Sequence, residues 1–377
     1  MTVYEKSDKL LQKVRISGGG RCNVTHACFS IDELIKFYPR GAKVLRGAFE
    51  KFSPADMISW LENEGVVLKT ESDGRIFPAS NSSLSIINCF CELLEKNKVN
   101  IKYSSHISQI IFKDDQCITL FDSNSNIAHY DYVIVCGGSS ASLWDMLGKV
   151  PLPIVSPVPS LFTFNSKDIL FKELSGISIP EVRISIVDTK YIMIGPILIT
   201  HWGLSGPAIL KLSAMAARHL ADLEYKFSIK INWINIREDE ALPLLKEIKF
   251  RNGKKKIFSF NNQLLPLRLW KNILVKADID EAKNWADMNK QEINLLARIL
   301  CNTDIYIAGK STNKDEFVTA GGVSLSAIDA KTMSVKIKPN LYMAGEVLDI
   351  DGYTGGFNFQ AAWTTAWIAA QSIINKL

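Results

Sequence analysis

Two glycine-rich segments, one near each end of the chain, constrain its fold more than any other feature. Gly18-Gly19-Gly20 is followed at once by Arg21, Cys22 and Asn23, and Gly355-Gly356 stands directly before an apolar stretch typical of a helix. Glycine permits positive φ angles and leaves backbone N–H groups unshielded by a Cβ atom. Such amides, like those of a helix N-terminus, bind phosphate or another acceptor. The two segments together predict one ligand held by both.

Apolar strands lead into polar groups beside further glycines. Tyr130 to Cys136 is a nearly continuous apolar run that ends in Gly137-Gly138, as a buried parallel strand does. Leu341 to Ala344 leads into Gly345 and Glu346, and a carboxylate at a strand end can accept hydrogen bonds from sugar hydroxyls. Arg21 is suited to a pyrophosphate, and Asn23 to a planar heterocycle. A tight loop with a surface arginine is the alternative interpretation of the first glycine segment.

The length and the pattern of the chain predict several domains. Its 377 residues are 47% hydrophobic, enough for a large core and for two or three domains. Four prolines between Pro151 and Pro159 mark a crossing between domains. The α/β patterns lie at both ends, with strands and then helices between them. We therefore expect an α/β domain made of 1–155 and 319–377, with a β-rich domain (156–236) and a small helical domain (237–318) inserted.

Local signals predict individual elements. Pro54 to Asn63 should form a helix capped by Ser53, because proline suits the first helical turn and serine the N-cap. The other predictions are a strand at Val66–Leu68, a helix from Leu84 to Asn97, a helix from about Ser205-Gly206-Pro207 to about Leu220, and a last helix from about Phe359.

Cysteine usage and the termini predict a reduced, cytoplasmic protein. The seven cysteines include no CxxC pair, so we expect neither a disulfide framework nor a metal site. The N-terminus lacks a signal-peptide core, and no stretch is long and apolar enough to span a bilayer. The net charge of +5 is mild and does not single out nucleic acid. The sequence leaves the oligomeric state open.

Four stretches of the chain resemble a known family. LLQKVRISGGGRCNVTH, ITHWGLSGPAILKLSA, FVTAGGVSL and LYMAGEVLDIDGYTGGFNFQAAWTTAW are similar, in this order, to signatures of the BaiN/YhiN-type FAD/NAD(P)-binding flavoproteins. The resemblance implies an α/β fold with a two-part, glutathione-reductase-type Rossmann-like domain (three-layer ββα) and inserted β-rich and helical domains. It also implies an FAD-dependent oxidoreductase that uses NAD(P)H as reductant and an organic acceptor such as a conjugated enone.

The same resemblance implies which residues contact FAD. Glu5, at the end of the opening strand, would bind the adenosine ribose. The segment 17–23 would line the pyrophosphate and the flavin, and Glu346 would bind the ribitol. The segment 355–358 would lie by the pyrimidine edge of the flavin, where the helix dipole favours the reduced anion. The full set is Glu5, Lys6, Ser17, Gly18, Gly19, Gly20, Arg21, Cys22, Asn23, Gly137, Gly138, Gly345, Glu346, Gly355, Gly356, Phe357 and Asn358.

Two features depart from the family pattern. Such domains begin with a strand, a GxGxxG turn and a helix, and the ribose-binding acid follows about 20 residues later. Here that acid is Glu5 and no GxGxxG occurs, so the chain resembles a member that starts at its second strand. Because the first strand is central in such sheets, we expect its absence to leave unpaired backbone on the neighbouring strands. In addition, residues 139–144 (SSASLW) replace a glycine- and threonine-rich segment, so we expect different surroundings for the flavin.

His201 and Tyr353 are the candidate proton donors, although a packed histidine and a structural tyrosine are the alternatives. Two other functions stay open. One is a non-catalytic or truncated flavoprotein-fold binding protein, and the other is a flavin-dependent nucleic-acid-modifying enzyme. The basic run from Lys249 to Lys256 would suit the latter. A solvated turn is the ordinary explanation of that run, so the sequence predicts a small-molecule substrate and not a nucleic acid.

Overall fold

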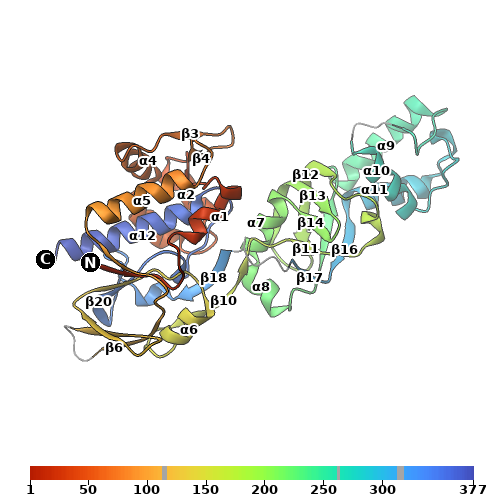
Figure 1. The fold of residues 1–377 in the computed structure, drawn as a ribbon. Coiled ribbons are helices and arrows are strands. Elements are labelled where there is room, and N and C mark those ends of the chain that lie inside the picture. Colours follow the sequence, from red (N-terminus) through yellow and green to blue (C-terminus); the bar gives the residue numbers. More distant parts are fainter. Residues whose placement is uncertain (113–116, 261–263, 312–317) are drawn as a thin grey trace. The chain divides into compact units, whose positions relative to one another are not determined.

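The computed structural model describes residues 1–112, 117–260, 264–311 and 318–377 (Figure 1). They form two compact units. The terminal unit comprises Met1–Val158 and Val318–Leu377, and the inserted unit comprises Pro159–Phe317. The chain leaves the terminal unit through β10 (Ile154–Ser160), which pairs with β18 (Val318–Val323). Pro159, the last of the four prolines, is therefore the first residue of the inserted unit.

Parallel strands from distant segments make the terminal unit an α/β structure, which confirms the predicted fold class. β1 (Thr2–Tyr4) pairs in parallel with β5 (Asn100–Lys102). β9 (Val133–Val135) pairs in parallel with β20 (Lys338–Met343), which also pairs with β19 (Ser334–Val335). Within the described residues, β1 and β9 each have one partner strand, so each has one open edge.

Two antiparallel sheets complete the strands of this unit. One holds β6 (Ile107–Phe112), β7 (Ile118–Asp122) and β8 (Ile127–Tyr130), and the other holds β2 (Thr25–His26), β4 (Arg75–Pro78) and β3 (Leu68–Thr70). Two strand predictions were wrong in their bounds. The strand predicted at 66–68 begins at Leu68, because Leu68 is the first residue that pairs with β4. The run predicted as one strand from Tyr130 divides, because Tyr130 pairs with β7 whereas β9 pairs with β20.

Helices cover these sheets, and two hydrophobic clusters form the core of the unit. α4 (Pro54–Asn63) has the predicted bounds, and Ser53 and Asp56 cap it reciprocally. α12 begins two residues before the predicted start. The remaining helices are α1 (Gln12–Gly20), α2 (Ile31–Leu34), α3 (Ala42–Phe49), α5 (Leu84–Lys96), α6 (Ala141–Leu147) and α12 (Phe357–Ile374).

The inserted unit is built on a seven-stranded sheet in the order β16-β15-β12-β13-β14-β11-β17. The two strands at the ends of this order, β16 and β17, are consecutive in sequence, since Ala308 alone separates them. The strands are β11 (Phe164–Asn165), β12 (Ser178–Ile186), β13 (Ile192–Thr200), β14 (Gly203–Ser205), β15 (Phe227–Asn232), β16 (Thr303–Ile307) and β17 (Gly309–Lys310).

Within the described residues of the unit, five α-helices accompany this sheet. The helix predicted from 205 to about 220 divides at Ala216 into α7 (Pro207–Met215) and α8 (Ala217–Asp222), because the backbone of Ala216 is not helical. The other three are α9 (Glu238–Asn252), α10 (Leu267–Lys276) and α11 (Lys290–Cys301). No helix within the described ranges has the length and apolar character needed to cross a membrane.

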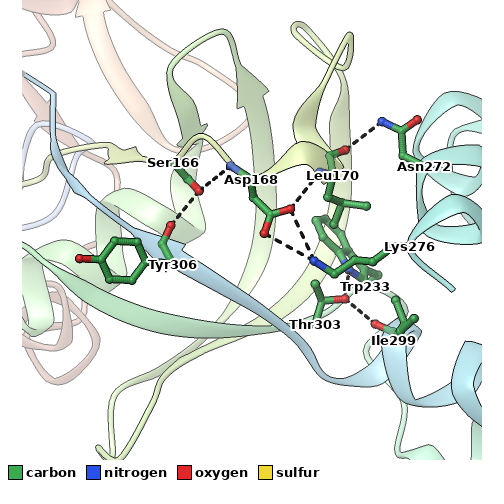
Figure 2. Close-up of polar contacts among 9 residues, drawn as sticks. All are labelled: Ser166, Asp168, Leu170, Trp233, Asn272, Lys276, Ile299, Thr303 and Tyr306. Atoms are coloured by element: carbon green, nitrogen blue, oxygen red, sulfur yellow. Dashed lines mark hydrogen bonds and ion pairs between the residues drawn. The ribbon is translucent and has the colours of Figure 1, made fainter. Parts of the chain in front are cut away.

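Polar contacts fasten the helices of the inserted unit to its sheet (Figure 2). Trp233 Nε1 donates to Thr303 Oγ1 at 2.8 Å, and Thr303 Oγ1 donates to the carbonyl of Ile299 in α11 at 2.5 Å. Lys276 of α10 pairs with Asp168 at 3.5 Å. These contacts, together with one continuous hydrophobic cluster, make the strands and helices of this unit a single body.

Candidate functional site

The first glycine segment forms a turn at the end of α1, here called the glycine turn (residues 17–23). Gly18, Gly19 and Gly20 have φ angles of 56°, 66° and 83°, which favour glycine. A Cβ atom on Gly18 would lie 3.0 Å from Asn23 N, so this glycine is required for packing. A Cβ atom on Gly19 or Gly20 would meet nothing within 4 Å. This part of the backbone therefore borders open space that a ligand can approach.

Two side chains of the glycine turn, those of Cys22 and Arg21, pack against or pair with other parts of the protein. Cys22 has no exposed surface, and burial raises the pKa of its thiol to about 11. It is therefore a neutral packing residue, and its contact with a cofactor stays a prediction. Arg21 Nη1 lies 2.6 Å from Glu71 Oε1, and its guanidinium stacks 4.0 Å above the ring of Phe77. Arg21 thus has internal partners where the sequence predicted a pyrophosphate.

Asn23 joins the glycine turn to the start of α12. With its amide oriented to satisfy its neighbours, Asn23 accepts a hydrogen bond from Gly356 N at 2.9 Å and donates to Thr25 O at 3.0 Å. A Cβ atom on Gly356 would lie only 2.6 Å from Thr25 O. The two glycine segments from opposite ends of the chain are therefore in contact, and the Asn23 amide holds them together.

A charged pair lies beside the glycines that follow β9. Lys13 Nζ pairs with Glu346 Oε2, and Thr319 N donates to Glu346 Oε1 at 3.1 Å. A Cβ atom on Gly138 would lie 3.5 Å from Lys13 Nζ and 3.7 Å from Glu346 Oε2. The sequence prediction missed Lys13. Its place one helical turn before Ser17, within the stretch LLQKVRISGGG, is the signal that would have found it.

The remaining predicted contacts lie at strand ends of the same unit. Glu5 Oε1 accepts hydrogen bonds from Ser7 N at 2.7 Å and Ser7 Oγ at 2.8 Å. Lys6 Nζ donates to Ser142 Oγ at 3.0 Å, and Gly345 N donates to Thr365 Oγ1 at 2.9 Å. Glu5 is held by a local turn, which fixes the direction of its carboxylate.

An aromatic stack supports the second glycine segment. The ring of Phe357 stacks on Phe37 at 4.2 Å and on His26 at 4.7 Å between centroids. A Cβ atom on Gly355 would lie 2.8 Å from Phe357 Cε2, so glycine permits this packing. Burial lowers the pKa of His26, which favours a neutral imidazole near neutral pH. Phe357 is buried, and its packing against Phe37 and His26 supports the second glycine segment.

The loop before α12 is held rigidly. Gly352 N donates to Asn358 Oδ1 at 2.8 Å, and Asn358 Nδ2 donates to Gly352 O at 2.8 Å. The buried carboxylate of Asp351 forms an ion pair with Arg40. Burial raises the pKa of Tyr353 in this loop, so its phenol keeps its proton at neutral pH.

The two candidate proton donors lie in different units. Tyr353 belongs to the terminal unit, together with both glycine segments. His201 belongs to the inserted unit, in the turn between β13 and β14. Its ring forms an edge-to-face contact with the ring of Trp202, with 4.2 Å between the ring centroids. His201 is exposed.

The donor set of the terminal unit fits a dinucleotide. Open backbone at Gly19 and Gly20 can approach phosphate oxygens, and Lys13 supplies a cation nearby in sequence. The carboxylates of Glu5 and Glu346 are acceptors of the kind that sugar hydroxyls require. The helix α12 adds the partial positive charge of its N-terminus.

Comparisons with known proteins identify the family of the chain. Residues 1–372 match the protein family described as HI0933-like protein Rossmann domain. Ribosomal RNA dihydrouridine synthases of Haemophilus influenzae and Escherichia coli are each 26% identical to this chain; they cover 99% and 96% of it, and 92% and 89% of their own lengths are matched. A 3-dehydro-bile acid delta(4,6)-reductase of Clostridium scindens is 21% identical, over 99% of this chain and 92% of its own.

Proposed function

The chain belongs to the HI0933-like Rossmann family of FAD-dependent oxidoreductases, and we propose that it reduces a carbon–carbon double bond conjugated with a carbonyl group, with NAD(P)H as reductant. The observation that carries the proposal is the contact between the two glycine segments, next to open space at Gly19 and Gly20. Bound FAD supplies the hydride-transfer chemistry. The chain's own residues bind it, orient it and manage charge and protons.

Each group of residues has a distinct task in this proposal. The backbone amides of the glycine turn bind the pyrophosphate, and Lys13 neutralises part of its charge. Glu5 and Glu346 accept hydrogen bonds from ribose and ribitol hydroxyls. The 18-residue helix α12 places the positive end of its dipole at Gly355-Gly356, where it stabilises negative charge that develops on a neighbouring ring.

Reduction of a double bond needs a proton as well as a hydride. We assign the proton to Tyr353, because it lies in the loop directly before Gly355-Gly356 and burial raises the pKa of its phenol. His201 stays the second candidate for this role.

The proposed acceptor is a uracil base in ribosomal RNA. Formation of dihydrouridine adds one hydride and one proton across the C5=C6 bond of uracil, which is conjugated with the C4 carbonyl. The two relatives named for this reaction are 26% identical to the chain. The sequence by itself favours a small molecule, and a steroid-like enone is the second candidate, because the bile acid reductase is 21% identical over a similar length.

The test is a reconstituted reaction. The purified chain is loaded with FAD and given NADH or NADPH, together with ribosomal RNA from cells that lack its gene. Mass spectrometry of the digested nucleosides should show uridine that has gained two hydrogen atoms, and only when FAD and the reductant are present. A panel of conjugated enones is followed in parallel through NAD(P)H oxidation. Absence of flavin-dependent turnover with both acceptor classes would contradict the proposal.

Glu346→Gln tests the cofactor contacts separately. The amide keeps the shape of the carboxylate but loses its charge, which pairs with Lys13. A hydrogen bond to a charged group contributes about 1.5–3 kcal/mol, so the Kd for FAD should rise roughly tenfold or more. Glu33→Gln is the matched control, because Glu33 pairs with Lys36 on the surface. Titration of flavin fluorescence measures both variants, and equal affinities would contradict the role of Glu346.

A further inference from the structure

The net positive charge of the chain resides entirely in the inserted unit. Residues 159–317 contain 23 lysines and arginines against 18 aspartates and glutamates, whereas the rest of the chain contains 21 of each kind. The densest group of cations is the segment 249–256, with five cations in eight residues. It consists of the end of α9 and the four residues that follow, and it is here called the basic loop. The proposed cofactor contacts lie in the neutral unit, so the surplus charge belongs to some other task.

The backbone of the basic loop is held in place by a second segment. Ala286 N donates to Gly253 O at 2.9 Å, and Trp285 N donates to Lys255 O at 3.1 Å. Ile257 N donates to the carbonyl of Lys283 at 3.2 Å. The side chain of Trp285 is fully buried in the hydrophobic cluster of the unit. The cations of the basic loop therefore project from an ordered backbone.

Two of these cations are available to an outside partner. Lys254 and Lys256 are exposed, and no described side chain forms an ion pair with either of them. The other cations have internal contacts. Arg251 pairs with Glu247 at 2.5 Å, Lys249 donates to the carbonyl of Met288 at 2.5 Å, and Lys255 lies 5.7 Å from the ring centroid of Phe260.

An exposed aromatic ring interrupts the same run. Phe250 is 91% exposed, slightly more than the C-terminal residue Leu377 at 90%. The preference of a helix C-terminus for cations explains Lys249 and Arg251, but it does not explain a phenylalanine in water. Aromatic rings set among cations are the feature by which proteins bind single-stranded nucleic acid, since bases stack on the ring and phosphates meet the cations.

We propose that the basic loop, with Phe250 within it, forms an RNA-binding surface for a single-stranded segment. Phe250 stacks on a base, and Lys254 and Lys256 contact the flanking phosphates. The inference rests on the proposed function with RNA as substrate, and it locates a contact with that substrate outside the cofactor-binding unit. An acidic lipid surface fits less well, because binding in the plane of a membrane uses a broad apolar helix face. In α9, Phe250 is the one large hydrophobic side chain that is strongly exposed among the described residues.

The experiment measures binding of the full chain to a fluorescein-labelled single-stranded RNA of mixed sequence, by fluorescence anisotropy at several salt concentrations. Lys254→Gln/Lys256→Gln should weaken binding roughly tenfold at low salt. The slope of log binding constant against log salt concentration should also become less steep by about 1.4, since each phosphate contact in a single strand contributes about 0.7 to that slope. Phe250→Ala should weaken binding about fivefold or more and leave the salt dependence unchanged.

Lys172→Gln/Lys190→Gln is the matched control, because both lysines are exposed in the same unit and the charge change is identical. It should change affinity less than twofold, and all variants should unfold at the same temperature. Equal effects of the two double variants would overturn the inference. So would binding to phosphatidylserine-containing vesicles without binding to RNA.

The outcome is separable from that of the proposed function. RNA binding that depends on the basic loop, without any reduction of uridine, would refute the RNA substrate and leave the surface standing. Reduction of uridine in ribosomal RNA, with binding that does not depend on the basic loop, would refute the surface and leave the function standing.

Discussion

Asn23 illustrates how the role of a single residue depends on partners that the sequence does not reveal. Its place directly after the glycines predicted a polar group near a ligand. In the structure its amide joins Gly356, and the neighbouring Arg21 pairs with Glu71, fifty residues along the chain. The residue types were consistent with ligand contacts, but tertiary neighbours already satisfy their hydrogen-bonding groups. Within the glycine turn, the backbone at Gly19 and Gly20 is the part that stays open to a ligand.

His26 is expected to make stability depend on pH. Burial lowers its folded-state pKa below the unfolded value of about 6.5, so the unfolded chain binds the proton more readily. The stability that the neutral His26 side chain contributes to the free energy of unfolding is therefore complete above about pH 6.5. It is lost as the pH falls through the folded-state pKa. Denaturant unfolding between about pH 8 and about pH 5 should show wild type losing more stability than His26→Gln.

His106→Gln is the control for that experiment, because it changes the same residue type outside the aromatic stack. Its stability should follow the wild-type curve in parallel. A constant difference between wild type and His26→Gln at every pH would show that His26 contributes only by stacking.

At the scale of elements, local signals succeeded where they act within the element itself. The predicted bounds of α4 are correct, because Ser53, Pro54 and Asp56 form a cap from neighbouring residues. The bounds of β3 and β9 were wrong, because pairing with β4 and β20 decides where those strands begin. The two glycine segments are in contact, because Asn23 accepts a hydrogen bond from Gly356, and one ligand held by both segments stays a prediction.

Gly356→Ala should separate the two glycine segments. Positive φ angles at Gly356 (91°) and Gly65 (84°) make alanine unfavourable at both positions, by roughly 1–2 kcal/mol. A Cβ atom at Gly356 would also meet Thr25 O at 2.6 Å, whereas at Gly65 it would meet nothing within 4 Å. Overpacking adds roughly 1–3 kcal/mol, so Gly356→Ala should destabilise more than Gly65→Ala and should also weaken FAD binding. Equal unfolding free energies for the two variants would contradict the close contact.

At the scale of the molecule, each of the two units has its own hydrophobic core. One hydrophobic cluster lies wholly within the inserted unit, and the other two lie wholly within the terminal unit. The match of residues 1–372 to one family confirms the resemblance that four sequence stretches indicated. The separate cores imply that a ligand of one unit stabilises that unit first.

FAD should therefore protect the terminal unit selectively. Ligand binding at about 100 times Kd stabilises the folded state by about 2.7 kcal/mol. Hydrogen–deuterium exchange with and without FAD should slow in the glycine turn and the first turns of α12. The β12–β13 hairpin of the inserted unit serves as the internal control and should exchange at the same rate. Equal protection of both units would show that they open together.

The sequence by itself determined the family, the α/β class and the glycine segments, because these depend on residue types at short spacing and on matches along the whole chain. Only the tertiary structure decided which polar groups remain for a ligand. It paired Arg21 with Glu71, buried Cys22, and placed Lys13 beside Glu346, 333 residues apart. It also showed Phe250 to be exposed, whereas a phenylalanine is most often buried. The physical reason is that hydrogen bonding and burial are satisfied by neighbours in space, which distance along the chain does not specify.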